Sequence, residues 1–124
     1  MTTKYDQTAA MIKNKAGAFI APTIDAVTAA AAGAIATTPE DLRVSITNAD
    51  GATAYPISSY TYILAYQDQK DATKGKAVVD FLWWGIHDGQ SFAKDLQYAS
   101  LPDEIVKRAE AKINSLASGG KPLR

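Results

Sequence analysis

The stretch Ser59-Tyr60-Thr61-Tyr62-Ile63-Leu64-Ala65-Tyr66 alternates in the manner of a β-strand. Successive side chains on a strand point to opposite faces, so the three tyrosines and Leu64 share one face and the intervening residues share the other. Both faces are largely apolar from Tyr62 onward, which is typical of an inner strand covered by helices on two sides. We therefore predict a strand over residues 59–66.

Helical patterns flank this strand on both sides. They span Ile24–Ala34, Thr73–Asp88, Ser91–Tyr98 and Pro102–Leu116. Thr23 supplies a capping hydroxyl for the first helix, Gly89 a left-handed cap for the second and Pro102 an N-terminal proline for the last. Such helices would supply the cover that the two apolar faces of the predicted strand require.

The remaining elements are predicted to be short. Leu42–Thr47 alternates apolar and polar residues like a half-buried strand, and Thr38–Asp41 has the proline and acids of a single helical turn. Ala18–Ala21 is predicted to be an extended segment after a connection that starts at the N-terminus. Ser118–Pro122 is predicted to be a tail.

Composition excludes several classes of function. The chain of 124 residues has 13 basic and 13 acidic residues, so no net charge attracts it to nucleic acid or to an anionic membrane. It has no cysteine, which excludes disulfides, thiolate metal sites and a cysteine nucleophile. Met1–Asp6 does not lead into the apolar core of a signal peptide. We predict a domain-sized chain with no affinity for nucleic acid, which either stays in the cytoplasm or is a piece of a longer protein whose signal lies upstream.

Few residues could carry catalysis. His87 is the only histidine, and no nucleophile turn accompanies it, so we expect it to contact the end of its own helix. The aspartates are scattered among turns and helix ends, where capping is their usual role. Ser118–Lys121 has the residue types of an anion-binding loop, but not the strand and helix that would aim its amides. We predict that the chain is not an enzyme and has no catalytic residue, metal site or cofactor.

Three longer stretches carry a family resemblance. They are Tyr55–Leu64 (YPISSYTYIL), Gly75–Trp84 (GKAVVDFLWW) and Asp95–Pro102 (DLQYASLP), supported by Ala16–Pro22 and Gly120–Leu123. Together they resemble the C-terminal part of the periplasmic phosphate-binding protein of the Pst-type phosphate ABC importer. The resemblance covers nearly all of this chain but only the last part of the family's length.

The resemblance implies an α/β fold, the C-terminal portion of a two-lobed periplasmic binding protein of type II. Its helices would pack on a mixed sheet, and its N-terminal portion would be missing. Residues 1–54 would form the end of the second lobe and the crossover, and residues 55–124 the C-terminal part of the first lobe. The return crossing near the hinge would consist of Tyr55, Pro56, Ile57 and Ser58. The family's phosphate ligands lie upstream, and no position here matches their motifs, so the resemblance implies no substrate-binding residue in this chain.

The expected function is therefore to supply scaffold and hinge for phosphate uptake. The resemblance implies inorganic phosphate as a partner only together with the N-terminal portion, the ABC permease as a second partner, and a location in the periplasm or cell envelope. The arginines are dispersed along the chain, as Arg43, Arg108 and Arg124. The alternative is a structural protein that self-associates through an open strand edge, which the oligomeric state in solution would distinguish.

Overall fold

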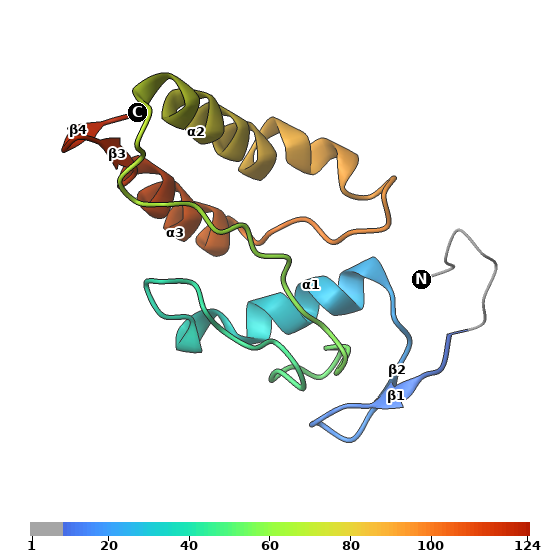
Figure 1. Cartoon of the computed structure of the whole chain (residues 1–124). Helices are drawn as coiled ribbons and strands as arrows, with labels where there is room; N and C mark the ends of the chain where they lie inside the picture. Colours follow the sequence, from blue (N-terminus) through green and yellow to red (C-terminus); the bar gives the residue numbers. More distant parts are fainter. Residues whose placement is uncertain (1–8) are drawn as a thin grey trace.

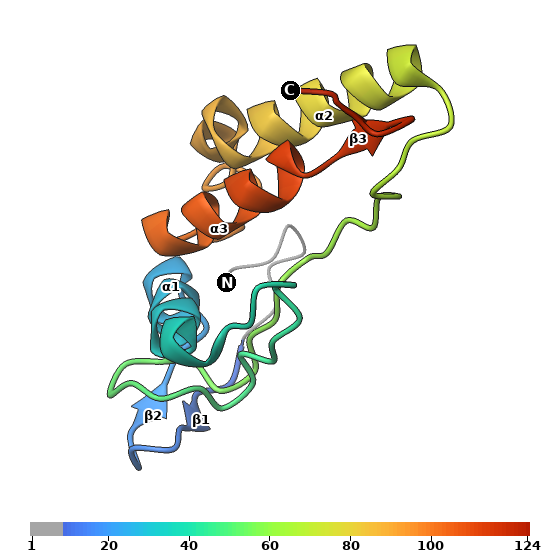
Figure 2. The same ribbon diagram turned by 90° about the vertical axis from the view of Figure 1, so that its left-hand side faces the viewer.

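The computed structural model describes residues 9–124, so the start of the predicted N-terminal connection lies outside the described residues. In chain order the elements are β1 (Ile12–Lys13), β2 (Phe19–Ile20), α1 (Ile24–Gly33), the 3₁₀ turn η1 (Ile35–Thr37), α2 (Ala72–Ile86), the 3₁₀ turn η2 (Asp88–Phe92), α3 (Asp103–Asn114), β3 (Ala117–Ser118) and β4 (Lys121–Pro122). They form two groups, one around α1 and one around α2 and α3 (Figure 1). An irregular segment that follows residue 55 runs from the first group to the second (Figure 2).

The α1 group is held together by a helix cap and by a buried asparagine. The Thr23 hydroxyl accepts a hydrogen bond from the Ala26 amide at 3.2 Å, which confirms the predicted capping role. The Asn14 side-chain amide donates to three carbonyls of the loop at residues 51–54. The core of this group consists of Ala31, Ala34 and Ile46, with Val44 and Tyr60 packed against it. The hairpin β1–β2, the loop and α1 are therefore one packed unit.

The second group packs α2 against α3 and ends in a hairpin. Its core consists of Val79, Ile113, Leu116 and Leu123, with Leu82, Trp83 and Ile86 packed against it. Between β3 and β4 lie Gly119 and Gly120, whose φ angles of 56° and 74° suit the primed turns of two-residue hairpin loops. This turn reverses the chain so that Leu123 reaches the core. The prediction of a tail over Ser118–Pro122 is therefore wrong.

Three of the four predicted helices are confirmed as α1, α2 and α3. The helix predicted over Ser91–Tyr98 is wrong, because η2 ends at Phe92 and turns follow it. Gln97 has a φ of 64°, a left-handed conformation that an α-helix cannot contain. Gly89 is not a left-handed cap either, since its φ angle is not positive. A Cβ there would lie 3.0 Å from the Trp84 carbonyl oxygen. A close approach to the end of α2 therefore explains this glycine.

The predicted helical turn at Thr38–Asp41 is also displaced. The helical turn η1 lies just before it, at Ile35–Thr37, and the chain then makes a turn closed by the Leu42 amide and the Pro39 carbonyl at 3.0 Å. The φ of Leu42 is 62°, so this turn cannot continue as a helix.

Neither Leu42–Thr47 nor Ser59–Tyr66 forms a strand within residues 9–124, and the predicted mixed sheet is wrong. The sheets of the described chain are two separate antiparallel hairpins. A strand requires hydrogen bonds to a neighbouring strand. Two residues after Tyr66, Asp68 forms an isolated parallel bridge with Ala117, and it is the only isolated bridge in residues 9–124. The alternating pattern is present, but the backbone partners that would make it a strand are not in the described chain.

Candidate functional site

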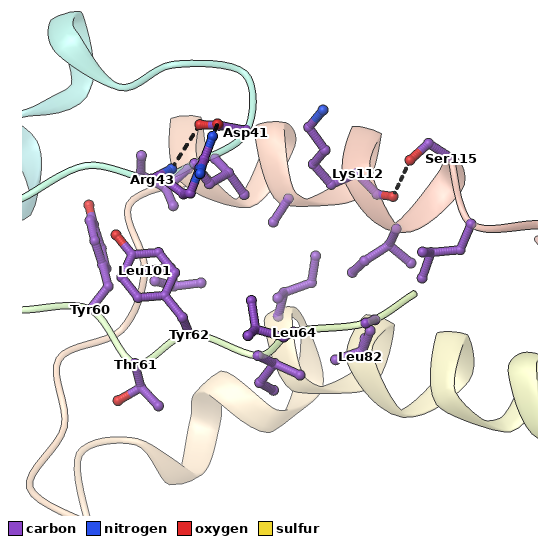
Figure 3. A pocket seen from close by; sticks show the side chains of 18 of the residues that line it. Asp41, Arg43, Tyr60, Thr61, Tyr62, Leu64, Leu82, Leu101, Lys112 and Ser115 are labelled. Carbon is purple, nitrogen blue, oxygen red and sulfur yellow. Dashed lines mark hydrogen bonds and ion pairs between the residues drawn. The ribbon is translucent and has the colours of Figure 1, made fainter. Parts of the chain in front are cut away.

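An apolar groove separates the segment Tyr60–Gln67 from the helices α2 and α3. Its cavity has a volume of about 430 Å³. The helices contribute Leu82, Ile86, Ile105, Ala109, Ile113 and Leu116 to its wall. Tyr60 and Tyr62 project from the segment to one side and Thr61 to the other (Figure 3). The alternation predicted for a strand is thus retained in side-chain direction, without a sheet.

A second cavity, of about 560 Å³, lies on the side of the segment that faces α1. Both cavities are bordered by Tyr60, Thr61, Ile63, Leu82, Ile86 and Leu101. The segment therefore has unfilled apolar space on two sides. This is the place where sequence reasoning predicted cover by other elements on both faces of a strand.

Tyr60 is the polar exception in this apolar space. Its hydroxyl oxygen is buried and has no hydrogen-bond partner among the described residues. Burial raises the pKa of the Tyr60 phenol, and the neighbouring Tyr62 adds to the effect. An unpartnered buried hydroxyl costs about 1–3 kcal/mol, which favours an additional hydrogen-bonding group at this position. The sequence marks Tyr60 only as a strand residue and does not show that its hydroxyl is unpartnered.

The three arginines of the chain each contact a different group. Arg43 binds Asp41 at 2.6 Å, and this guanidinium lowers the pKa of the Asp41 carboxyl. Arg108 of α3 donates to the Thr38 carbonyl. Arg124 lies 3.5 Å from the centre of the Trp83 ring. Because each arginine has a different partner, the three are not gathered into an anion site, which agrees with their dispersion in the sequence.

His87 lies at the C-terminal end of α2, as predicted, and also contacts α3. Its Nδ1 is 2.8 Å from the Trp83 carbonyl oxygen and its Nε2 is 2.7 Å from Glu110 Oε1. Two acceptors require two donors, so the ring is favoured in its protonated form. The Trp83 carbonyl and then the Glu110 carboxylate raise the pKa of His87. The sequence missed Glu110, because the spacing of 23 residues between the two carries no local signal.

The hinge residues predicted at Tyr55, Pro56, Ile57 and Ser58 lie against the α1 group. The Tyr55 amide donates to the Ala26 carbonyl at 3.0 Å, and the Pro56 carbonyl accepts from Asn48 at 2.8 Å. The Ser58 hydroxyl donates to the Tyr55 carbonyl, while Ile57 is exposed. The four residues are therefore contiguous and largely fixed at the point where the chain leaves the α1 group.

The described residues hold neither a metal cluster nor a membrane-spanning helix. Across residues 9–124, no three histidine, cysteine or acidic side chains cluster as a metal site would require. Over the same range, no helix has the length and hydrophobicity needed to cross a membrane. The groove and the segment Tyr60–Gln67 that borders it are the candidate site.

Comparison with known proteins finds relatives with one common description, although no family model matches. The chain is 38% identical over 100 residues to the phosphate-binding protein PstS of Xylella fastidiosa (strain 9a5c), covering 81% of this chain and 28% of that protein. It is 34% identical over 116 residues to PstS of Pasteurella multocida, covering 92% and 34%. For PstS of Methanocaldococcus jannaschii the identity is 31% over 120 residues, covering 86% and 30%.

The relatives are binding proteins by name, and not enzymes. This chain is homologous to part of the PstS phosphate-binding proteins and is a partial, PstS-like segment. The chain spans about a third of the length of these relatives. Three helices with two small hairpins are consistent with a portion of a periplasmic binding protein.

Proposed function

We propose that this chain is a scaffold portion of a phosphate-binding protein for ABC-type phosphate uptake. The observation that carries the proposal is its homology to PstS proteins over most of its own length and about a third of theirs. The unfilled apolar groove supports it, because the remaining portion of such a protein could supply the strands and side chains that fill the space. Phosphate ligands would then come from that remaining portion.

In this proposal Tyr55–Ser58 is the crossing between two lobes. The support comes from the contacts on either side of this segment. Tyr55 is hydrogen-bonded to α1 and Pro56 to the loop at Asn48. The irregular segment that leads to the second group begins directly after Ser58 (Figure 1). Residues 1–54 would belong to one lobe and residues 55–124 to the other. Closure on a ligand would then change backbone angles in this short segment and leave the two packed groups intact.

The proposed partners and location follow from the relatives. The complete protein would bind inorganic phosphate and deliver it to the permease of the importer, in the periplasm or at the cell envelope. No residue of this chain is proposed to touch phosphate, since Arg43, Arg108 and Arg124 have separate partners.

A chimeric protein tests the proposal. This chain replaces the matched segment of the Pasteurella multocida protein, and calorimetry measures phosphate binding. We expect the folded chimera to bind phosphate one-to-one. Lys74→Gln, on the exposed side of α2, is a control that should leave binding unchanged. Leu82→Asp buries a charge in the groove wall and should abolish folding and binding together. A folded chimera that does not bind phosphate would contradict the proposal.

One observation favours a second function, that of a self-associating structural protein. Large apolar side chains are exposed on both groups, including Phe19, Ile57, Leu64, Tyr66, Phe81 and Leu96. Exposed apolar patches of this kind mark interaction surfaces. Calorimetry on the chimera separates the two functions, because a chain with only a structural role would not restore phosphate binding.

A further inference from the structure

The backbone of the segment at residues 61–65 is unpaired. Within the described part of the chain, its amides and carbonyls make no hydrogen bond to protein. The neighbouring carbonyls of Tyr60 and Tyr66 accept only from side chains, those of Ser59 and Gln69. A row of free donors and acceptors on an extended backbone is a template for pairing with another strand.

The segment is held in place at both ends. The Tyr62 hydroxyl donates to the Val44 carbonyl at 2.7 Å on the α1 side. At the other end Gln67 and Gln69 bond with Ala117, which starts the hairpin β3–β4. The segment is therefore held in one conformation before a partner binds, which lowers the entropic cost of pairing.

Side chains of the segment are unusually exposed for their type. Ile63 is 65% exposed, Leu64 96% and Tyr66 83%. No charged residue occurs from Ser58 to Gln67, so nothing in the segment repels a second copy of itself. Natural sheets usually protect such an edge with charges or proline. This edge has neither.

We propose that two copies of this chain pair antiparallel along residues 60–66, around a two-fold axis at Ile63. In this register Tyr60 lies opposite Tyr66 of the second copy, and Tyr62 lies opposite Leu64. The register is self-complementary, since each aromatic or aliphatic side chain meets another on the same face. The pairing also satisfies the free amides and carbonyls on the facing edge of each segment.

In a solution of the isolated chain, the segment available to pair with this open edge is the same segment of a second copy. The inference rests on the open edge and does not depend on phosphate binding, so it can fail while the scaffold function holds. In a complete phosphate-binding protein the same edge would be covered by the remaining portion, which would prevent pairing between copies.

Cysteine cross-linking tests the register. In the proposed dimer the two Ile63 Cα atoms are about 4.5 or 5.5 Å apart, which a disulfide can bridge. Because the chain has no cysteine, Ile63→Cys introduces the only thiol. Leu96→Cys is a matched control, with 66% exposure against 65% for Ile63. We expect rapid covalent dimerisation of Ile63→Cys under mild oxidation and little of Leu96→Cys.

Sedimentation velocity on the unmodified chain and on Ile63→Lys completes the test. The unmodified chain should dimerise, and two lysines facing each other across the axis should weaken the dimer by about tenfold or more. A monomer at about 100 μM would overturn the inference. So would a dimer that Ile63→Lys leaves unchanged, or one in which both cysteine variants cross-link equally, since the contact would then lie elsewhere.

Discussion

His87 shows how a single side chain connects two helices of this fold. Its ring stacks on Trp83 with 4.4 Å between centroids, and its two nitrogens face the Trp83 carbonyl and the Glu110 carboxylate. About a third of each of the two paired side chains is exposed, so solvent screens the pair without removing it. The contact acts between the end of α2 and the middle of α3.

We predict that the stability of the chain falls as pH rises through the pKa of His87. The folded pKa is raised above the ordinary histidine value of 6.5, so the stabilisation is complete below 6.5 and is lost as pH rises through the folded value. Thermal unfolding measured at intervals between about pH 5.5 and 8.5 checks this. His87→Gln should remove most of the dependence, and Glu110→Gln should reduce it. An unchanged profile in His87→Gln would contradict the assignment.

At the level of the helices, two glycines have opposite roles. A Cβ at Gly33, the last residue of α1, would lie 1.8 Å from the Asp50 carbonyl oxygen. Gly85 lies within α2, and a Cβ added there would meet no atom within 4 Å, so this glycine only adds backbone freedom. The end of α1 is therefore specified by the loop that crosses it, whereas α2 tolerates a side chain at Gly85.

This contrast predicts opposite effects of the same substitution. Gly33→Ala forces the loop at Asp50 away from α1 and should destabilise the chain by about 1–3 kcal/mol. Gly85→Ala should stabilise it by about 0.5–1 kcal/mol, because alanine loses less backbone entropy in a helix. Urea unfolding of both variants measures the two free energies. Equal effects would show that the approach of Asp50 to α1 does not constrain the fold.

The sequence indicated the helices better than the strands. α1, α2 and α3 form where the apolar spacing and capping residues predict them, because a helix satisfies its hydrogen bonds within one stretch of chain. Ser59–Tyr66 has an equally clear pattern and no strand partner. Its hydrogen bonds would have to come from another segment, and a local pattern does not specify which one.

At the scale of the whole molecule, the two groups and the groove bring no arginines together into an anion site within residues 9–124. We predict that the isolated chain binds no phosphate specifically. A desolvated phosphate needs several converging donors, usually with an arginine, and the three arginines are engaged with Asp41, Thr38 and Trp83. Calorimetric titration checks this prediction, with the natural phosphate-binding protein of Pasteurella multocida as the positive control. A one-to-one isotherm with micromolar or tighter affinity would contradict it.

The sequence by itself determined the family resemblance, the three helices and the zero net charge, which does not attract nucleic acid. These depend on residue identity and short-range spacing, which a single chain displays directly. The His87–Glu110 contact, the Gly-Gly hairpin that carries Leu123 into the core and the unpaired state of Ser59–Tyr66 were decided only by the tertiary structure. Each depends on which distant segments meet, because the partners of a side chain or a strand edge are set by packing and not by the local pattern.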